Sequence, residues 1–369
     1  MRRYTTLLLT AFLLLAIVIA GSAYLAGTGH IDHRTREQEI TVLTTLPAEE
    51  AEILSQAYED SSGVHVTFVP LSSADVLERA KAQAGSPQKS GPAMVLADWQ
   101  TLGQASRSGY LVPYLSERGD MVAAAFRQDD GYWMGVWYDP IIFCINRDYL
   151  ISLHTDIPDT WQALADQDGR VGITDFMAAD ASSNLLYAMD AEFGDEKTLE
   201  LLDKIHPRVV QYARYLSNPV RQAGMGEVDI SIAVESETLR YIHDGYPLQI
   251  IYPADGTTAW ITGTGILAGS GDRERVLAQN FADWLLSDEA QLALQSHNYF
   301  FVPTNPGDDG LPVLPRQESH ALHADAAALG GREARPARHV GARDPIQMIG
   351  EDALRHPPLY GLCDCIYQY

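Results

Sequence analysis

The chain carries short polar side chains at a predicted helix start, where they are suited to hold a small anion. In DFMAADASSNLLYAMDAEFG, residues 175–194, the pattern indicates a strand end, a loop and a helix that begins at 182–184 and ends at Gly194. Ser182, Ser183 and Asn184 are favoured capping residues, and the free N–H groups of a helix start bind anions. No acid falls in the first turn of that predicted helix. The alternative is that the two serines only cap it.

A second group of polar residues follows predicted strands nearer the N-terminus. Thr44 and Thr45 end the run EITVLTT, and Asp98 and Trp99 end the run AMVLADW. Ligands of open parallel sheets lie outside the carboxyl ends of the strands, so these four residues are candidates for ligand contact. The alternative is structural, since Thr44 or Thr45 can cap the next helix and Asp98 can cap a helix starting near Thr101.

One arginine lies in a segment suited to a phosphate or carboxylate. Arg221 follows Ser217 and Asn218 in SNPVRQAGMGEVD, and its guanidinium can donate two parallel hydrogen bonds to either group. A solvated arginine is the alternative. In the preceding VVQYARYLSN, Tyr212 and Tyr215 are spaced to share one face of a helix.

Motifs for catalysis are absent from the sequence. It has no His-Glu-x-x-His, no Gly-x-Ser-x-Gly and no Gly-x-x-x-x-Gly-Lys-Ser/Thr, and GTGILAG lies inside a predicted strand. The 11 histidines show no ligand spacing. Cys144 is the one cysteine of the body, with Cys363 and Cys365 near the C-terminus, so no disulfide framework is predicted. We therefore expect a binding protein without catalytic residues, metal or cofactor.

The elements that would position the candidates alternate between strand and helix. Strands are predicted at 39–45, 64–71 and 93–99, with helices from Pro47 to Gly63 and over 73–83. Strands joined through helices pair in parallel with right-handed crossovers. The fold class is therefore α/β.

The N-terminus indicates export. Residues 1–29 contain Arg2 and Arg3 followed by an apolar run of about 20 residues, the length that spans a bilayer. Either the segment is a signal peptide cleaved near Ala23, or it stays as a membrane anchor. No cysteine follows it, which disfavours a lipoprotein. The formal net charge of −23 argues against nucleic acid or an anionic membrane surface as a partner.

A series of segments then resembles one family. These segments are EITVLTTLPAEEAEILSQAYEDSSGVHVTFV, GYLVPYLSE, GYWMGVWYDPIIFCINRDYL, IPDTWQALADQDGRVGI, GEVDISIAV, GYPLQIIYPADGT and NFADWLLSDEAQ. In this order they resemble type 2 periplasmic solute-binding proteins of ABC importers, the branch with ferric-iron, phosphonate and organophosphate binders. The resemblance runs from about Glu39 to Asn305.

The resemblance implies two α/β lobes joined by crossing strands, with a ligand cleft between them. Lobe 1 would comprise 39–138 plus 258–305, and lobe 2 would comprise 139–257. The segment around Asp255, Gly256 and Thr257 would then lie at the hinge, where Asp255 and Thr257 can face a ligand. The alternative is that Asp255 and Gly256 only form a tight turn.

The resemblance also bears on the ligand. Iron-binding members carry an adjacent tyrosine pair in the region that here contains Glu235 and Ser236, and this chain has no Tyr-Tyr pair. We expect an anionic solute such as an organophosphate, phosphonate or carboxylate. The expected contacts are Thr44, Thr45, Asp98, Trp99, Ser182, Ser183, Asn184, Arg221, Glu235, Asp255 and Thr257. Asp98, Glu235 and Asp255 cannot all face an anion without cost, so at least one meets a hydroxyl or amine, or is structural.

The implied partner is an ABC permease in the membrane, and the implied location is periplasmic or extracellular. Three alternatives stay open: a membrane-tethered sensor that reports to a sensor kinase, a ferric-iron binder and a polyamine binder of the same fold. Residues 315–369 depart from the family, with clustered Arg, His and Pro and little apolar periodicity. This tail is either disordered or the product of a shifted reading frame.

Overall fold

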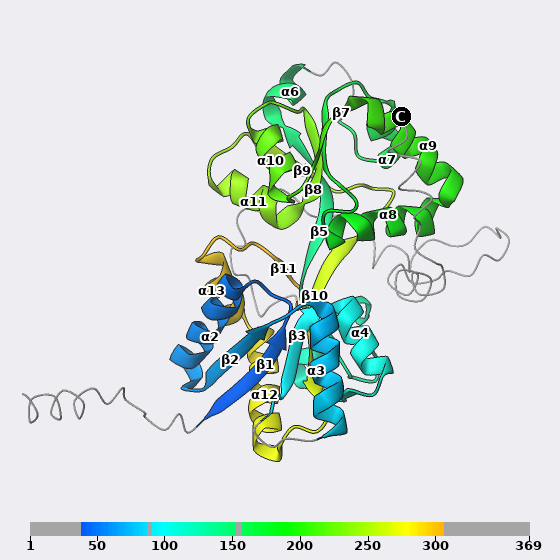
Figure 1. Cartoon of the computed structure of the whole chain (residues 1–369). Coiled ribbons are helices and arrows are strands. Elements are labelled where there is room, and N and C mark those ends of the chain that lie inside the picture. Colours follow the sequence, from blue (N-terminus) through cyan, green and yellow to red (C-terminus); the bar gives the residue numbers. More distant parts are fainter. Residues whose placement is uncertain (1–37, 87–90, 153–156, 306–369) are drawn as a thin grey trace, which may run out of the picture.

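The computed structural model describes residues 38–86, 91–152 and 157–305. The predicted leader (1–29) and the atypical tail (315–369) lie outside these described residues. Figure 1 shows two lobes, one above the other, joined by β5 and β10. Within the described residues, no helix is long and apolar enough to cross a membrane.

Lobe 1 is built on a sheet with the strand order β2-β1-β3-β10-β5. Its strands are β1 (Glu39–Thr44), β2 (His65–Pro70), β3 (Met94–Asp98), β4 (Leu111–Val112), the first part of β5 (Met134–Asn146), β10 (Ala259–Leu267) and β11 (Val302–Pro303). Its helices are α2 (Ala48–Ser62), α3 (Ser73–Gly85), α4 (Trp99–Arg107), α5 (Glu117–Met121), η1 (Ala124–Phe126), α12 (Asp272–Leu285) and α13 (Asp288–Gln295). β1 pairs in parallel with β2 and β3, which confirms the alternation predicted from the sequence.

Helix α2 illustrates how local chemistry sets the ends of an element. Glu49 and Glu50 lie in its first turn, where carboxylates face the positive end of the helix dipole. Gly63 ends the helix in the left-handed conformation, with φ 72°. On the buried face, the ring of Tyr58 lies 4.8 Å from that of Phe281 in α12, centroid to centroid. The helix is therefore fixed by its C-terminal cap and by one aromatic cluster.

Lobe 2 continues from the second part of β5 with the strand order β5-β8-β6-β7. Its strands are β6 (Val171–Thr174), β7 (Val209–Ala213), β8 (Ile230–Val234) and β9 (Leu248–Ile251). Its helices are α6 (Arg147–Ser152), α7 (Trp161–Asp166), α8 (Asp180–Phe193), α9 (Asp195–Ile205), η2 (His206–Arg208), α10 (Ser217–Gly224) and α11 (Glu235–His243). β6 pairs in parallel with β7 and β8, so the ends of all three strands lie at one edge of the sheet.

The structure corrects two expectations from the sequence. Helix α8 begins at Asp180, two residues before Ser182, so an acid does occupy its first turn. The segment around Tyr212 forms β7 rather than a helix, and Tyr215 lies beyond the strand, so the two tyrosines share no helix face. The segment 283–294 is divided between α12 and α13, which are separated at Leu286 and Ser287.

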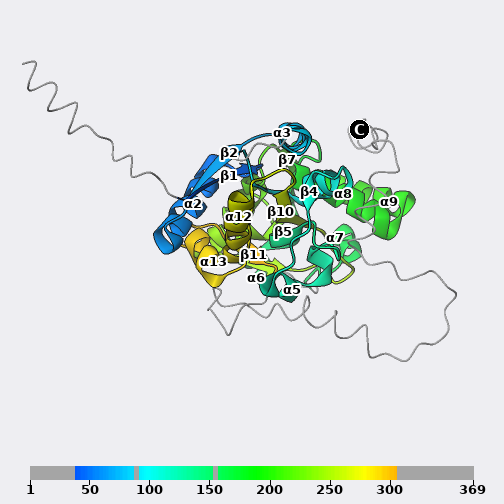
Figure 2. The same cartoon turned by 90° about the horizontal axis from the view of Figure 1, so that it is seen from below.

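The strand β5 belongs to both lobes. Its residues Tyr138 and Asp139 pair with Ile261 and Trp260 of β10, whereas Ile141 pairs with Val234 of β8. Seen along the molecule in Figure 2, β5 and β10 lie centrally, with α2 and α13 to one side and α8 and α9 to the other. The two strands therefore carry the chain between the lobes and bring the functional edges of both sheets together.

Each lobe has its own core. In lobe 1, one cluster forms around Leu54, Trp137 and Phe281. In lobe 2, alternate residues of β5 enter two different clusters, with Phe143 beside Trp161 on one face and Cys144 on the other. This alternation is the two-residue period of a strand buried on both faces.

Candidate functional site

The site is defined by two sheet edges that meet at the crossing strands. In lobe 1, Asp98 at the end of β3 pairs with Thr262, next to the crossing part of β10. In lobe 2, Val234 at the end of β8 pairs with Ile141, next to the crossing part of β5. We call these facing strand ends and the helix starts that follow them the interlobe edge. Most of the candidates predicted from the sequence lie at or beside this edge.

In lobe 1, two of the four candidates have structural partners. The buried hydroxyl of Thr44 donates to the carbonyl of Leu96 at 2.7 Å and accepts from the amide of Leu46 at 3.0 Å. The carboxylate of Asp98 caps α4, since it accepts from the amide of Thr101 at 2.8 Å and from its hydroxyl at 2.7 Å. Asp98 is therefore held in place by the capping role that was the alternative to ligand contact.

Thr45 and Trp99 are the lobe 1 candidates whose side chains stay available. Both are half-buried, and among the described residues neither side chain makes a hydrogen bond. They follow β1 and β3 directly, so they lie at the interlobe edge.

At the start of α8, the three predicted residues have different surroundings. The hydroxyl of Ser183 donates to the carbonyl of Phe176 at 2.5 Å. The hydroxyl of Ser182 has no hydrogen-bond partner among the described residues. The buried amide of Asn184 donates through Nδ2 to Thr258 Oγ1 at 2.7 Å, while its Oδ1 has no partner there. The hydroxyl of Ser182 and the Oδ1 of Asn184 can therefore form further hydrogen bonds beside the crossing strand β10.

At α11, a carboxylate already fills the helix start. Asp139 of β5 accepts from the amide of Ser236 at 2.9 Å and from its hydroxyl at 2.6 Å. Glu235, the first residue of α11, is buried and accepts from the hydroxyl of Tyr252 at 2.7 Å. The start of α11 is therefore a poor place for an anion, because Asp139 occupies it.

Two buried carboxyl groups, Asp139 and Glu50, have raised pKa values. Burial raises the pKa of Asp139 to about 7, against the Ser236 hydrogen bonds, with the charges of Glu235 and Glu237 adding to the rise. Burial raises the pKa of Glu50 in α2 to about 7, and the charges of Glu49, Asp139 and Glu237 add to it. Sequence reasoning missed Asp139 and Glu50, since the burial of each arises from packing between segments distant in the sequence.

The side chains of the hinge candidates Asp255 and Thr257 are hydrogen-bonded to backbone groups of the protein. Both oxygens of Asp255 accept from the amide of Trp161, at 3.1 and 2.9 Å, and so cap α7. Burial raises the pKa of Asp255, and the hydrogen bond from the Trp161 amide opposes that rise. The indole of Trp161 donates to the carbonyl of Gly256 at 2.9 Å. The hydroxyl of Thr257 donates to the carbonyl of Ile141 at 2.6 Å. These contacts fasten the second crossing segment to lobe 2 and to β5.

Arg221 lies away from the interlobe edge. Its guanidinium lies 3.1 Å from the sulfur of Met225 and 3.7 Å from the carboxylate of Glu227. Glu227 precedes β8, whereas Glu235 follows that strand, so Arg221 is directed to the opposite end of the sheet. The structure does not bring Arg221 together with the other candidates.

A different arginine occupies the interlobe edge. Arg214 directly follows β7, is exposed, and makes no ion pair among the described residues. Helix α10 begins three residues later, at Ser217, with no acid in its first turn and no side-chain cap. Arg214 was missed because VVQYA was interpreted as helical; interpreted as a strand, it would have placed Arg214 at a carboxyl end.

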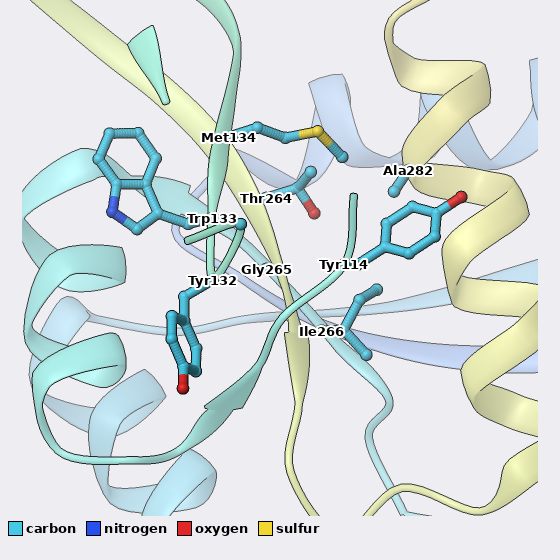
Figure 3. A pocket seen from close by; sticks show the side chains of 9 residues that line it. Tyr114, Tyr132, Trp133, Met134, Thr264, Gly265, Ile266 and Ala282 are labelled. Carbon is cyan, nitrogen blue, oxygen red and sulfur yellow. The ribbon is translucent and has the colours of Figure 1, made fainter. Parts of the chain in front are cut away.

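Two cavities exist away from this edge. The cavity in lobe 1 (Figure 3) is lined by residues that include Tyr114, Met134 and Gly265 and measures about 10 Å³, enough for one water molecule at most. A cavity of about 240 Å³ in lobe 2 lies beside Arg170 and Asp229, which pair with each other at 2.8 Å. Neither is lined by a candidate residue. Across the described ranges, no group of three or more His, Cys, Asp or Glu could hold a metal ion.

The family is settled by comparison with known proteins. Residues 54–309 match the family described as bacterial extracellular solute-binding protein. The chain belongs to this family. An uncharacterised protein of Haemophilus influenzae is 25% identical over 295 residues, which cover 78% of this chain and 84% of that protein.

Solved structures show the same two-lobed type 2 fold. AfuA from Actinobacillus pleuropneumoniae, solved with exogenous fructose-6-phosphate bound, is 22% identical over 74% of this chain and 89% of its own, with a TM-score of 0.56. Iron-bound HitA from Pseudomonas aeruginosa is 17% identical over 89% of this chain and 99% of its own, with a TM-score of 0.65. A Bordetella ferric binding protein is 21% identical, over the same shares, with a TM-score of 0.65. At these identities the likeness establishes the fold alone.

The family membership confirms the resemblance found in the sequence segments. The chain is a solute-binding protein of the ABC importer type, and its relatives in family and fold are binding proteins rather than enzymes. The family implies that a small-molecule solute is delivered to an ABC permease. An extracellular family is consistent with a periplasmic location.

Proposed function

We propose that this protein captures a small anionic solute between its lobes, an organophosphate, phosphonate or carboxylate, and delivers it to an ABC permease. The observation that carries the proposal is the start of α10, which has neither an acid nor a side-chain cap and follows the exposed Arg214. Free helix N–H groups and an unpaired guanidinium are the groups that bind phosphate. Ser182, at the start of α8, adds a hydroxyl at the same edge.

The carboxylates at the interlobe edge favour a solute that also donates hydrogen bonds. Glu50, Asp139 and Glu235 would repel a second negative group, whereas hydroxyl groups donate to carboxylates. The unpartnered Oδ1 of Asn184 is a further acceptor. A phosphorylated polyol would offer a phosphate to the start of α10 and hydroxyl groups to the hydrogen-bond acceptors. The fructose-6-phosphate bound in AfuA supports this class of solute.

Capture is proposed to occur by closure of lobe 1 (39–138 plus 258–305) onto lobe 2 (139–257). Thr45 and Trp99 would contact the solute from lobe 1, and Ser182, Asn184 and Arg214 from lobe 2. Thr44, Asp98, Ser183, Asp255 and Thr257 would hold these residues in position through the hydrogen bonds described above. Arg221 has no part in the proposed contact.

A cationic solute such as a polyamine is the second candidate. It is favoured by the negative charge of Glu235, Asp139 and Glu237 at and beside the start of α11. Ferric iron is disfavoured, because the segment after β8 contains Glu235 and Ser236 in place of a tyrosine pair. Transport is favoured over signalling to a sensor kinase by the family, and the identity of the neighbouring genes tests it.

A thermal-shift screen of the purified protein tests the ligand class. Its panel contains phosphate esters, phosphonates, dicarboxylates, polyamines and Fe(III). A solute at a hundredfold excess over its dissociation constant stabilises the folded state by about 2.7 kcal/mol. We expect phosphate esters with hydroxyl groups to give the largest rise in melting temperature. A rise with Fe(III) or polyamines alone would contradict the anion proposal.

A further inference from the structure

Three consecutive aromatic residues of lobe 1 lie between α13 and β11. Tyr299 and Phe301 pack on the core of lobe 1, with their ring centroids 6.3 Å apart. Phe301 also stacks on Trp137 of β5 at a centroid distance of 5.7 Å. Phe300, between them, belongs to none of the apolar core clusters of the described residues. This alternation is that of an extended chain, so Phe300 faces away from the core that its neighbours share.

Phe300 is nevertheless buried, and its ring contacts lobe 2. It is 7% exposed, and its ring centroid lies 5.6 Å from that of His243, at an interplanar angle of 43°. His243 is the last residue of α11, which packs on β8 and β9 of lobe 2. Figure 1 shows α11 above α13, across the division between the lobes. The contact therefore joins an aromatic side chain of lobe 1 to a helix of lobe 2.

Phe300 is fixed to its own lobe on both sides. Before it, the amide of Tyr299 donates to the carbonyl of Leu294 in α13 at 3.1 Å. After it, Val302 of β11 pairs with Tyr138 of β5. Phe300 therefore moves with lobe 1 and α11 moves with lobe 2, so bending at the crossing strands must change the contact between them.

The contact is set apart from the proposed solute contacts. Helix α11 begins at Glu235, at the interlobe edge, and ends at His243. At 1.5 Å per residue, the contact lies about 12 Å along the helix from that edge. A solute at the interlobe edge is therefore not expected to touch Phe300. An effect of Phe300 on capture must act through the arrangement of the lobes.

We propose that Phe300 is a positioning residue for solute capture, which seats lobe 1 against the end of α11 and holds the two lobes in the arrangement described above. Separation of the lobes would expose its ring to water, which is unfavourable for an apolar side chain. The contact therefore raises the fraction of molecules in which the interlobe edge is assembled. Because apparent affinity falls with the fraction of binding-competent molecules, Phe300 strengthens solute binding. This last step rests on the proposed function, whereas the effect on the lobes needs no solute.

The test is single-molecule energy transfer between the lobes of the full chain, without solute. Dyes are attached at Lys81→Cys in α3 and Glu196→Cys in α9, both exposed positions. Cys363 and Cys365 are replaced by serine, and Cys144 is buried and stays unlabelled. The distribution of label distances then reports the arrangement of the lobes.

Two variants remove the contact, one from each lobe. Phe300→Ala removes the ring of lobe 1, and His243→Ala removes its partner in lobe 2; the side chain of His243 is 47% exposed, so its loss leaves the fold intact. Two matched controls keep the contact. Phe301→Ala makes the same change at the neighbouring residue that faces the lobe 1 core. His206→Ala removes a histidine ring that stacks on Tyr212 within lobe 2, at 5.8 Å.

We expect both contact variants to shift molecules away from the parent distance. In Phe300→Ala the ratio of molecules at the parent distance to those at other distances should fall about tenfold, since an apolar ring no longer becomes exposed when the lobes separate. Adding His243→Ala to Phe300→Ala should change little further, because the two residues act through one contact. The controls should keep the parent distribution. A parent distribution in Phe300→Ala, or an equal shift in Phe301→Ala, overturns the inference.

Solute binding separates this inference from the proposed function. Calorimetric titration with fructose-6-phosphate should show binding to Phe300→Ala that is weaker than binding to the parent by at least about twofold. A shifted distance distribution with unchanged affinity overturns the positioning role. Absence of binding by the parent contradicts the proposal of a phosphorylated polyol, and the distance measurement then decides the role of Phe300 by itself.

Discussion

Glu50 makes the stability of the protein depend on pH in an unusual direction. Its pKa is raised from 4.5 to about 7 in the folded state, so the folded protein holds a proton that the unfolded chain releases. The stabilisation by this proton is complete below the unfolded pKa and is lost as pH rises from about 4.5 to about 7. Most carboxylates act in the opposite sense, because native ion pairs lower their pKa values.

Glu50→Gln is therefore expected to increase the free energy of unfolding at pH 8 by about 1–3 kcal/mol, since each unit of pKa shift corresponds to about 1.4 kcal/mol. Urea denaturation at pH 8 and near pH 4.5 measures it, and the difference should vanish at the lower pH. Glu49→Gln serves as the control. Equal or lower stability of Glu50→Gln at pH 8 would refute the assignment of Glu50 as a buried, unpartnered acid.

Asp255 is expected to contribute to stability and not to binding. Asp255→Ala leaves the first amide of α7, that of Trp161, without its acceptor, and loss of a helix cap costs about 1–2 kcal/mol. Urea denaturation measures the loss, with the exposed neighbour Asp159→Ala as the matched control. Solute affinity should be unchanged. A drop in affinity at unaltered stability would show that Asp255 faces the ligand.

At the scale of elements, the turn between β9 and β10 depends on one glycine. Gly256 has a φ of +110°, and a Cβ there would meet no atom within 4 Å, so a substitution is opposed by backbone strain alone. Gly256→Ala should destabilise the protein by about 1–2 kcal/mol. Gly85→Ala, at a site equally open but without positive φ, should not destabilise it. Equal melting temperatures for the two variants would show that backbone strain does not oppose a substitution at Gly256.

The elements also explain which parts of the structure the sequence could predict. The order β1-α2-β2-α3-β3 was predictable because alternating apolar runs and capping residues are local signals. The start of α8 was misplaced because its N-cap is Ala179, which carries no capping group. β7 was taken for helix because five residues are too short to show a period. Asp139 and Glu50 were missed because the burial of each arises from packing between distant segments.

At the scale of the whole molecule, two separate cores and two crossing strands allow the lobes to move relative to each other. Each lobe buries its own clusters, and β5 and β10 are the strands that pair through the division. The hydrogen bonds made by Asp255, Gly256 and Thr257 fix the end of the second crossing segment to lobe 2 and to β5. We therefore expect bending to be concentrated in residues 138–140 and 258–260.

The central claim, capture of an anionic solute at the start of α10, is tested most directly by calorimetric titration of two arginine variants. The titrant is the phosphate ester that gives the largest thermal shift in the screen. Arg214→Gln should weaken binding at least tenfold, since a charge-assisted hydrogen bond to phosphate contributes about 1.5–3 kcal/mol. Arg221→Gln, the same change at the opposite end of the sheet, should bind like the parent. Equal affinity of Arg214→Gln and the parent, or weaker binding by Arg221→Gln than by Arg214→Gln, would contradict the account.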